Sequence, residues 1–195
     1  MQVHRNTDHL PVFRKAVITI GTFDGVHQGH RELLSKLKEE ASRVGGESVI
    51  ITFHPHPRKI VSSAILGIRL INTMDERIGL LSEIGIDHLV IVPFTEAFAN
   101  LPAEDYISSF LIDRFHPHTI IIGYDHRFGR DRLGDFRLLE KHASTYNYIL
   151  IEIPKHLLEN ISISSTNIRE AILHSDFETA NKLLGYQDRK STRLN

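Results

Sequence analysis

The sequence predicts a doubly wound α/β fold, in which helices cover both faces of a parallel sheet. Short runs of β-branched and other apolar residues recur along the chain, and segments with helical periodicity lie between them. These runs do not alternate between apolar and polar residues, which is typical of strands that are buried on both faces. The alternation of such strands with helices is characteristic of a parallel sheet with crossover helices.

The expected strands are residues 16–20 (AVITI), 48–53 (SVIITF), 88–94 (HLVIVPF), 119–123 (TIIIG) and 148–153 (YILIEI). The connecting segments have the three- and four-residue apolar spacing of amphipathic helices, at residues 31–44, 74–84, 103–115 and 136–145. Two further helical segments follow the last strand, at residues 165–173 and 176–184. We therefore expect one domain over residues 1–186. Residues 187–195 are polar and aperiodic, so we expect a disordered or foreign tail there.

The composition is that of a globular domain and does not indicate a nucleic-acid or membrane partner. A chain of 195 residues with 41% hydrophobic and 24% charged residues is long enough to bury a core. The net charge of −1 provides no basic field for nucleic acid, and no apolar stretch has the length of a membrane span or a signal peptide. The lack of cysteine excludes disulfides and thiolate metal sites. We expect a cytoplasmic protein without nucleic-acid or membrane partners, while the oligomeric state stays open.

The first stretch that indicates chemistry is GTFDGVHQGH, residues 21–30, between the first strand and the first helix. Its glycines let backbone approach a ligand, and a helix N-terminus attracts anions. The stretch is neither a Walker loop nor a G-x-G-x-x-G fingerprint. His27 falls at the helix cap and His30 one turn later, so both rings face the same side. Two alternatives stay open: His30 as a core histidine, and a zinc site built from the histidine pairs.

Three more stretches lie at or beyond the carboxyl ends of later strands. TFHPHP, residues 52–57, holds Phe53, His54 and His56 between stiffening prolines, although a rigid turn with Phe53 in the core explains it as well. GYDHRFGRDRLGD, residues 123–135, crowds arginines around Asp125 and Phe128, or is simply a charged surface loop. Because ligands bind outside the carboxyl ends of parallel strands, we expect these stretches to line one site.

ISSTNIR, residues 163–169, begins the helix after the last strand. Ser164 is a candidate N-cap, and Ser165 and Thr166 share a helix face with Arg169. A capping motif explains the hydroxyl residues but not the arginine. Two helix N-termini with cationic partners indicate a site for a polyphosphate and a second ligand.

Together these stretches resemble the FMN adenylyltransferase (FAD synthetase) module of the bacterial bifunctional riboflavin kinase/FAD synthetase family. The motif G-x-F-D-G-V-H-x-G-H matches residues 21–30, T-F-x-P-H-P matches 52–57, and I-S-S-T-x-I-R matches 163–169. Residues 94–107 are similar to the family's segment after the third strand. The family's G-x-D-F-x-F-G matches residues 123–129, with His126 in place of the first phenylalanine. The implied fold is the Rossmann-like parallel sheet of the H-x-G-H nucleotidyltransferase superfamily.

The resemblance implies transfer of AMP from ATP to FMN, which yields FAD and pyrophosphate and needs Mg²⁺ but no metal ligand from the protein. The implied catalytic residues are His27, His30 and Arg169, with the histidines near their ordinary pKa of ~6.5. The implied ATP-binding residues are Gly21, Thr22, Phe23, Asp24, Gly29, Ser164, Ser165 and Thr166. The implied FMN-binding residues are Phe53, Pro55, His56, Pro57, Asp125 and Phe128.

The family continues into a β-barrel riboflavin kinase domain, whereas this chain stops soon after Gly185. The expectation is therefore adenylyl transfer without riboflavin kinase activity. Two other functions stay open: another small-molecule adenylyl- or cytidylyltransferase of the superfamily, and a nucleotide- or flavin-binding module without catalysis.

Overall fold

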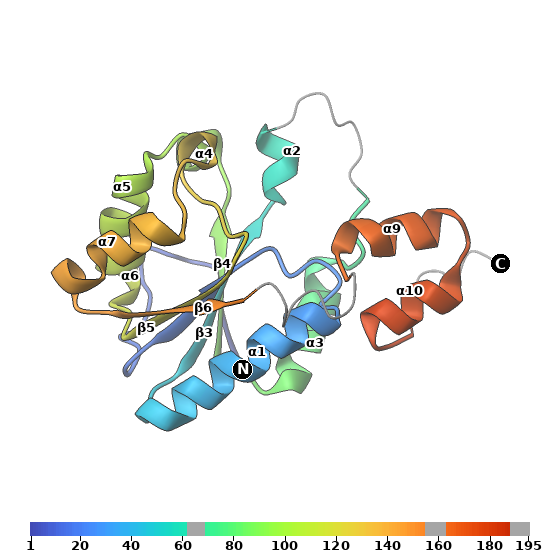
Figure 1. The fold of residues 1–195 in the computed structure, drawn as a ribbon, viewed down its shortest axis with the longest axis horizontal. Helices are drawn as coiled ribbons and strands as arrows, with labels where there is room; N and C mark the ends of the chain where they lie inside the picture. The colour runs from blue at the N-terminus through green and yellow to red at the C-terminus, as the bar shows by residue number, and fades with distance from the viewer. Residues whose placement is uncertain (62–68, 155–162, 188–195) are drawn as a thin grey trace.

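The computed structural model describes residues 1–61, 69–154 and 163–187. Within these residues the strands form one six-stranded, wholly parallel sheet, in the order β1-β4-β3-β2-β5-β6. The strands are β1 (Gln2–His4), β2 (Val17–Ile20), β3 (Ser48–His54), β4 (His88–Pro93), β5 (Thr119–Gly123) and β6 (Ile149–Ile153). The predicted α/β class and all five predicted strands are confirmed (Figure 1).

Strand β1 is an addition that sequence patterns missed. It is a three-residue edge strand that pairs with β4, with Gln2 opposite His88 and His4 opposite Val90. Three residues of mixed polarity carry no periodicity, and only the exposed edge of β4 brings them into the sheet. Tertiary pairing therefore decides this element.

The helices follow the expected pattern, with several short additions. They are α1 (Gln28–Val44), α2 (Pro57–Val61), α3 (Met74–Ile84), α4 (Glu96–Ala99), α5 (Ala103–Asp105), the π-helix η1 (Tyr106–Ile112), α6 (Asp113–Phe115), the 3-10 turn η2 (Arg130–Arg132), α7 (Phe136–Tyr146), α9 (Ser165–Leu173) and α10 (Phe177–Leu184). The predicted helix over residues 103–115 is a continuous run of α5, η1 and α6. None of the helices in the described residues is long and apolar enough to cross a membrane.

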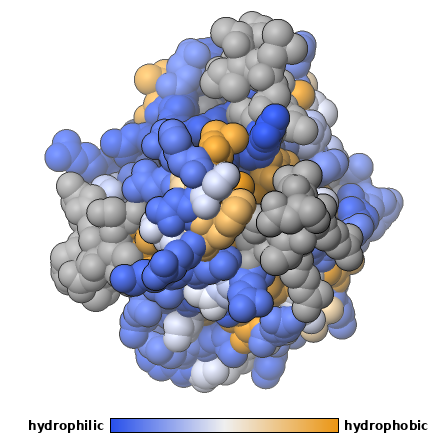
Figure 2. Space-filling view, turned by 90° about the vertical axis from the view of Figure 1, so that its right-hand side faces the viewer, coloured by the Kyte–Doolittle hydropathy of each residue, from blue (hydrophilic) through white to orange (hydrophobic). Residues whose placement is uncertain are grey.

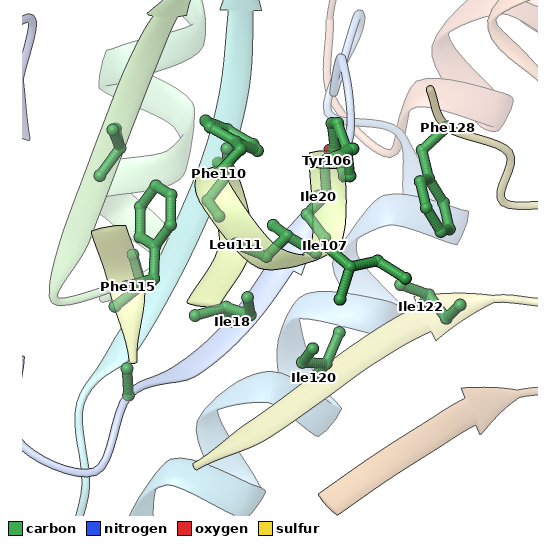
Figure 3. Close-up of a cluster of buried hydrophobic side chains, with 14 of the residues drawn as sticks. Ile18, Ile20, Tyr106, Ile107, Phe110, Leu111, Phe115, Ile120, Ile122 and Phe128 are labelled. Carbon is green, nitrogen blue, oxygen red and sulfur yellow. The ribbon is translucent and has the colours of Figure 1, made fainter. Parts of the chain in front are cut away.

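Alternate residues of the strands point to two separate cores, which is the physical basis of the doubly wound architecture. Ile18 of β2 and Ile120 of β5 pack with η1 and α6 on one face (Figure 3), where Leu139 of α7 belongs to the same core. Val17 and Ile121, their neighbours in sequence, pack with α1 and α3 on the other face. Because successive side chains of a strand leave opposite faces, runs buried on both sides must be apolar throughout.

Helices α9 and α10 lie side by side at one end of the molecule (Figure 1). A small third core of Ile71, Ile168 and Leu184 joins them to the segment before α3. This core holds the last two helices close to the loop that follows β2. It therefore brings residues 163–169 toward residues 21–30.

Candidate functional site

The loop from β2 to α1 is buried, although it is rich in glycine. Phe23, Asp24 and Val26 are all buried, and the backbone turns through positive φ at Phe23, Gly25 and Val26. At Gly25 the φ is +87°, and a Cβ there would lie 3.0 Å from the Cδ1 atom of Ile71. A side chain at this position would meet both strain and a close contact, so glycine is required.

His27 and His30 form a stacked pair at the N-terminus of α1. His27 is the N-cap, and its Nδ1 atom accepts a hydrogen bond from the backbone N–H of His30 at 3.3 Å. The ring centroids are 3.6 Å apart and the planes differ by 14°. The ring of Phe23 lies beside the pair, with its centroid 5.1 Å from that of His30. The expectation that both imidazoles face the same side is therefore confirmed.

The expectation that these histidines keep an ordinary pKa is wrong for this chain. Burial lowers the pKa of His27 to about 4, although the carboxylate of Asp24 opposes the shift. Burial, His27 and the guanidinium of Arg77 lower the pKa of His30 well below its usual value. Both rings are therefore neutral at pH 7. Because Nδ1 of His27 accepts a hydrogen bond, the hydrogen of that ring is on Nε2, which leaves Nε2 as a donor.

Asp24 is the point at which three segments meet. Its Oδ1 atom accepts hydrogen bonds from the backbone N–H groups of Ile71 at 3.0 Å and Asn72 at 3.3 Å. Its Oδ2 atom accepts a hydrogen bond from Nη2 of Arg169 at 3.2 Å. Nη2 of Arg77 lies 3.7 Å from Oδ1. The carboxylate thus faces protein groups, and any contact of Asp24 with a nucleotide would come from its backbone.

The fourth stretch contacts the first at this carboxylate. Ser164 is the N-cap of α9, and its hydroxyl accepts a hydrogen bond from the N–H of Asn167 at 3.1 Å. The hydroxyl of Ser165 donates to the backbone carbonyl of Asp24 at 2.8 Å. Thr166 is exposed at the first turn of the helix. The capping explanation therefore holds for Ser164, whereas Ser165 and Arg169 bind the loop after β2.

Residues 52–57, the second stretch, include one side chain in the hydrophobic core and others near the candidate site. Phe53 is buried, with its ring centroid 5.4 Å from that of Phe94, so it is the last core residue of β3. Pro55 and Pro57 are half-buried, and Pro57 begins α2. His56 is buried, and its Nδ1 atom accepts a hydrogen bond from the N–H of Arg58 at 3.2 Å.

The electrostatic surroundings of His56 connect it to the same cluster. Burial lowers the pKa of His56 to about 4, the negative charge of Asp24 raises it, and the charges of Arg77 and Arg169 lower it further. The second stretch therefore lies within the electrostatic reach of Asp24. His56, like the stacked pair, is neutral at pH 7.

The third stretch is tied to a different part of the molecule. Phe128 is buried and stacks on Tyr106 of η1, with centroids 4.9 Å apart. Asp125 is exposed. The loop is also held by backbone hydrogen bonds, from Tyr124 to the carbonyl of Ile153 in β6 and from Arg130 to the carbonyl of Leu101 before α5. Within the described residues, the ring contact of Phe128 is thus with η1 and not with the histidine pair.

Sequence reasoning missed Arg77 and Tyr186. Arg77 shares the apolar, core-facing stripe of α3 with Met74, Ile78 and Leu81, and it is buried there. A charged residue at an apolar position of the helix was the sequence signal that could have identified it. The hydroxyl of Tyr186 donates to the carbonyl of Gly25 at 2.6 Å. Tyr186 follows α10, where no pattern in the sequence marks it.

No group of three histidine, aspartate or glutamate side chains in the described ranges lies close enough to hold a metal ion. The face that carries α9 and α10 is largely hydrophilic around a narrow hydrophobic strip (Figure 2). The positive charge at the site comes from arginines, because His27, His30 and His56 are neutral at pH 7.

Comparison with known proteins decides the family. A family model described as FAD synthetase matches residues 10–167. The chain belongs to the FAD synthetase family.

Curated relatives of this FAD synthetase family chain are named bifunctional riboflavin kinase/FMN adenylyltransferase. One from Buchnera aphidicola subsp. Schizaphis graminum is 39% identical over 171 residues, which are 87% of this chain and 54% of the relative. One from Escherichia coli strain K12 is 35% identical over 170 residues, again 87% of this chain and 54% of the relative. One from Pseudomonas fluorescens is 32% identical over 196 residues, 100% of this chain and 62% of the relative. The chain thus spans little more than half the length of these relatives.

A solved structure has a similar fold. It is described as a macrolide-efflux protein from Streptococcus pneumoniae, and it superposes with a TM-score of 0.79 at 28% sequence identity. The match covers 95% of this chain and 60% of that one. The α/β architecture of this FAD synthetase family member therefore recurs in a longer chain.

Proposed function

We propose that this chain transfers AMP from ATP to FMN, with FAD and pyrophosphate as products. The observation that carries the proposal is the convergence on Asp24 of the loop with the histidine pair and the helix with Arg169. Two guanidinium groups lie beside one buried carboxylate, so the site retains positive charge for a polyphosphate. The N-termini of α1 and α9 belong to the same cluster, because Ser165 at the start of α9 donates to the backbone carbonyl of Asp24 in the loop that leads into α1. The curated relatives carry FMN adenylyltransferase in their names, which supports FMN as the acceptor.

In the proposed reaction, a phosphate oxygen of FMN attacks the α-phosphorus of ATP. The new P–O bond forms as the bond to the β-phosphate oxygen breaks, so negative charge grows on the departing pyrophosphate. Such a transfer depends on positioning and charge stabilisation. His27 would donate from Nε2, and Arg169 would bind phosphate oxygens with its planar guanidinium. His30 completes the proposed catalytic set.

The remaining proposed contacts are with the two substrates. ATP would lie against Gly21, Thr22, Phe23, Asp24 and Gly29 of the loop, and against Ser164, Ser165 and Thr166 at the start of α9. On the flavin side, Pro55, His56 and Pro57 would contact FMN directly. Phe53 and Phe128 would support that side from the core, and Asp125 would meet the ligand only from its exposed loop.

The reaction would also need Mg²⁺, which neutralises charge on the phosphates when it is bound. The carboxylate of Asp24 is surrounded by N–H groups and guanidinium groups, so it is a poor metal ligand. Magnesium also retains water and binds phosphate oxygens readily. We therefore propose that Mg²⁺ arrives bound to ATP and has no binding site of its own on the protein. We also propose that the reaction takes place in the cytoplasm.

Product analysis tests the proposal. The purified chain is incubated with ATP, Mg²⁺ and FMN, and the products are separated by chromatography; FAD and pyrophosphate are expected in equal amounts. Parallel reactions contain phosphopantetheine or riboflavin in place of FMN, and neither dephospho-coenzyme A nor FMN is expected. Turnover of phosphopantetheine alone would indicate another adenylyltransferase. Binding of ATP or FAD without turnover would indicate a binding module.

A further inference from the structure

The charges of Asp24, Arg77 and Arg169 are not balanced among themselves. Asp24 contributes one negative charge, and Arg77 and Arg169 contribute two positive charges, within 3.7 Å and 3.2 Å of its oxygens. The side chains of Asp24 and Arg77 are only 1% and 2% exposed. Removing a charge from water is costly unless an opposite charge compensates it. A buried arginine on an otherwise apolar stripe therefore needs an explanation beyond packing.

The two arginines differ in what they can reach. Arg169 is 18% exposed and makes a hydrogen bond to Oδ2 of Asp24, so it borders both the carboxylate and the surface. Arg77 lies beneath, and its 3.7 Å separation from Oδ1 is a charge interaction rather than a hydrogen bond. Arg77 is thus too deeply buried to meet a ligand, but it is close enough to neutralise Asp24.

We infer that Arg77 is a positioning residue, which neutralises Asp24 so that Arg169 is held by that carboxylate and still has positive charge to offer a phosphate. Without Arg77, the whole negative charge of Asp24 would act on Arg169 and would repel an incoming polyphosphate. The inference rests on the proposed function, because it takes the ligand of Arg169 to be the phosphate chain of ATP. Asp24 also anchors the backbone of Ile71 and Asn72, which keeps the carboxylate fixed between the two guanidinium groups.

The test compares Arg77→Met, Asp24→Asn and the double variant in the full chain. Binding of ATP with Mg²⁺ is measured by calorimetry, and FAD formation is measured in parallel. We expect Arg77→Met to weaken ATP binding at least tenfold and Asp24→Asn by only a few-fold. The double variant should bind more tightly than Arg77→Met, since the unneutralised carboxylate is gone. Equal or additive losses would overturn the inference, because Arg77 would then act independently of Asp24.

Arg77→Lys is the control for folding. A lysine keeps the positive charge, and the 3.7 Å separation does not depend on guanidinium geometry, so ATP binding within about threefold of the parent is expected. If Arg77→Met does not fold, a tenfold loss of ATP binding in folded Arg77→Lys would overturn the inference.

Failure of the proposed function has a different signature. In that case the parent chain would bind ATP but form no FAD, while the order of ATP affinities among the variants would still test Arg77. Should the parent not bind ATP, the side-chain N–H signals of Arg169 in NMR report on the same contact without a ligand. Arg77→Met should slow their exchange with water at least threefold, and unchanged exchange would overturn the inference.

Discussion

At the scale of single residues, burial sets the chemistry of the histidine pair. Two stacked imidazoles in a loop would titrate near pH ~6.5 if they were exposed. Because both rings are withdrawn from water, they are neutral at pH 7, and the positive charge of the site belongs to Arg77 and Arg169. The histidines therefore act as neutral hydrogen-bonding groups, whereas the arginines provide the charge.

Replacing His30 with alanine should lower the turnover number for FAD formation by roughly 10²–10³, the loss that follows removal of one transition-state donor. The residue stacks on His27 at the mouth of α1. The measurement is the turnover number at saturating ATP and FMN, with circular dichroism to establish folding. His9→Ala is the control, because His9 is exposed. Near-normal turnover of folded His30→Ala would make His30 a structural residue.

Replacing Arg169 with lysine should impair the use of ATP although the charge is kept. A guanidinium can hold Asp24 and a phosphate oxygen at once through separate N–H groups, whereas an ammonium is a single point charge. The quantity to measure is kcat/KM for ATP, which should fall at least tenfold. Arg77→Lys provides the contrast, since that pair needs charge alone. Equal values for Arg169→Lys and the parent would exclude a bidentate role.

At the scale of elements, the loop after β5 is shaped by packing against η1. Two backbone hydrogen bonds between Phe128 and Gly134, at 2.9 and 3.1 Å, close the loop. Phe128 then stacks on Tyr106, and a Cβ at Gly134 would overlap the Phe128 ring. The arrangement explains why a loop of charged residues is anchored by an aromatic side chain in the core.

Gly134→Ala should therefore destabilise the fold by about 1–3 kcal/mol, because Phe128 must leave its place on Tyr106. Gly79→Ala is the matched control. Gly79 lies inside α3, and an added methyl group there would meet nothing within 4 Å, so the change should stabilise by about 0.5–1 kcal/mol. Urea unfolding of both variants measures the two effects. If Gly134→Ala were as stable as the parent, Phe128 would have moved from its place on Tyr106 without a cost in stability.

At the scale of the whole molecule, buried neutral histidines make stability depend on pH. Burial lowers the pKa of His27, His56 and His126 to about 4. In the unfolded chain these groups take up protons near pH ~6.5. Between pH ~6.5 and about 4 the unfolded state binds more protons, so the free energy of unfolding falls as the pH falls. The contribution is complete above pH ~6.5 and lost by about pH 4.

His126→Phe tests this dependence at one position. Nε2 of His126 is buried without a hydrogen-bond partner among the described residues, and nearby Arg132 and Arg127 further disfavour its protonated form. The difference in unfolding free energy between pH 8 and pH 5 should therefore be smaller in His126→Phe than in the parent, by roughly 1 kcal/mol or more. Denaturant unfolding at both pH values measures it. His9→Phe, at an exposed position, should keep the parent's difference, and an unchanged difference in His126→Phe would contradict the account.

Much of this molecule was predictable from local pattern. Apolar runs without alternation predicted the five longer strands, because strands buried on both faces leave no polar positions. The order of strands and helices predicted a parallel sheet, whereas the expectation that the stretches at the carboxyl ends of its strands line one site stays a prediction. The cap at Ser164 was a local signal too, since serine is a characteristic residue of helix N-termini.

Other features depend on residues that meet only after folding. The edge strand β1 exists because β4 offers an unpaired edge. The neutral state of the histidines depends on how much water the packed chain excludes, and the burial of Phe53 and Phe128 is set by the same packing. Asp24 and Arg77 are 53 positions apart, and 92 more separate Arg77 from Arg169. No local pattern in the sequence can predict an interaction between residues so far apart, so the pairing of these three charges is a property of the tertiary structure.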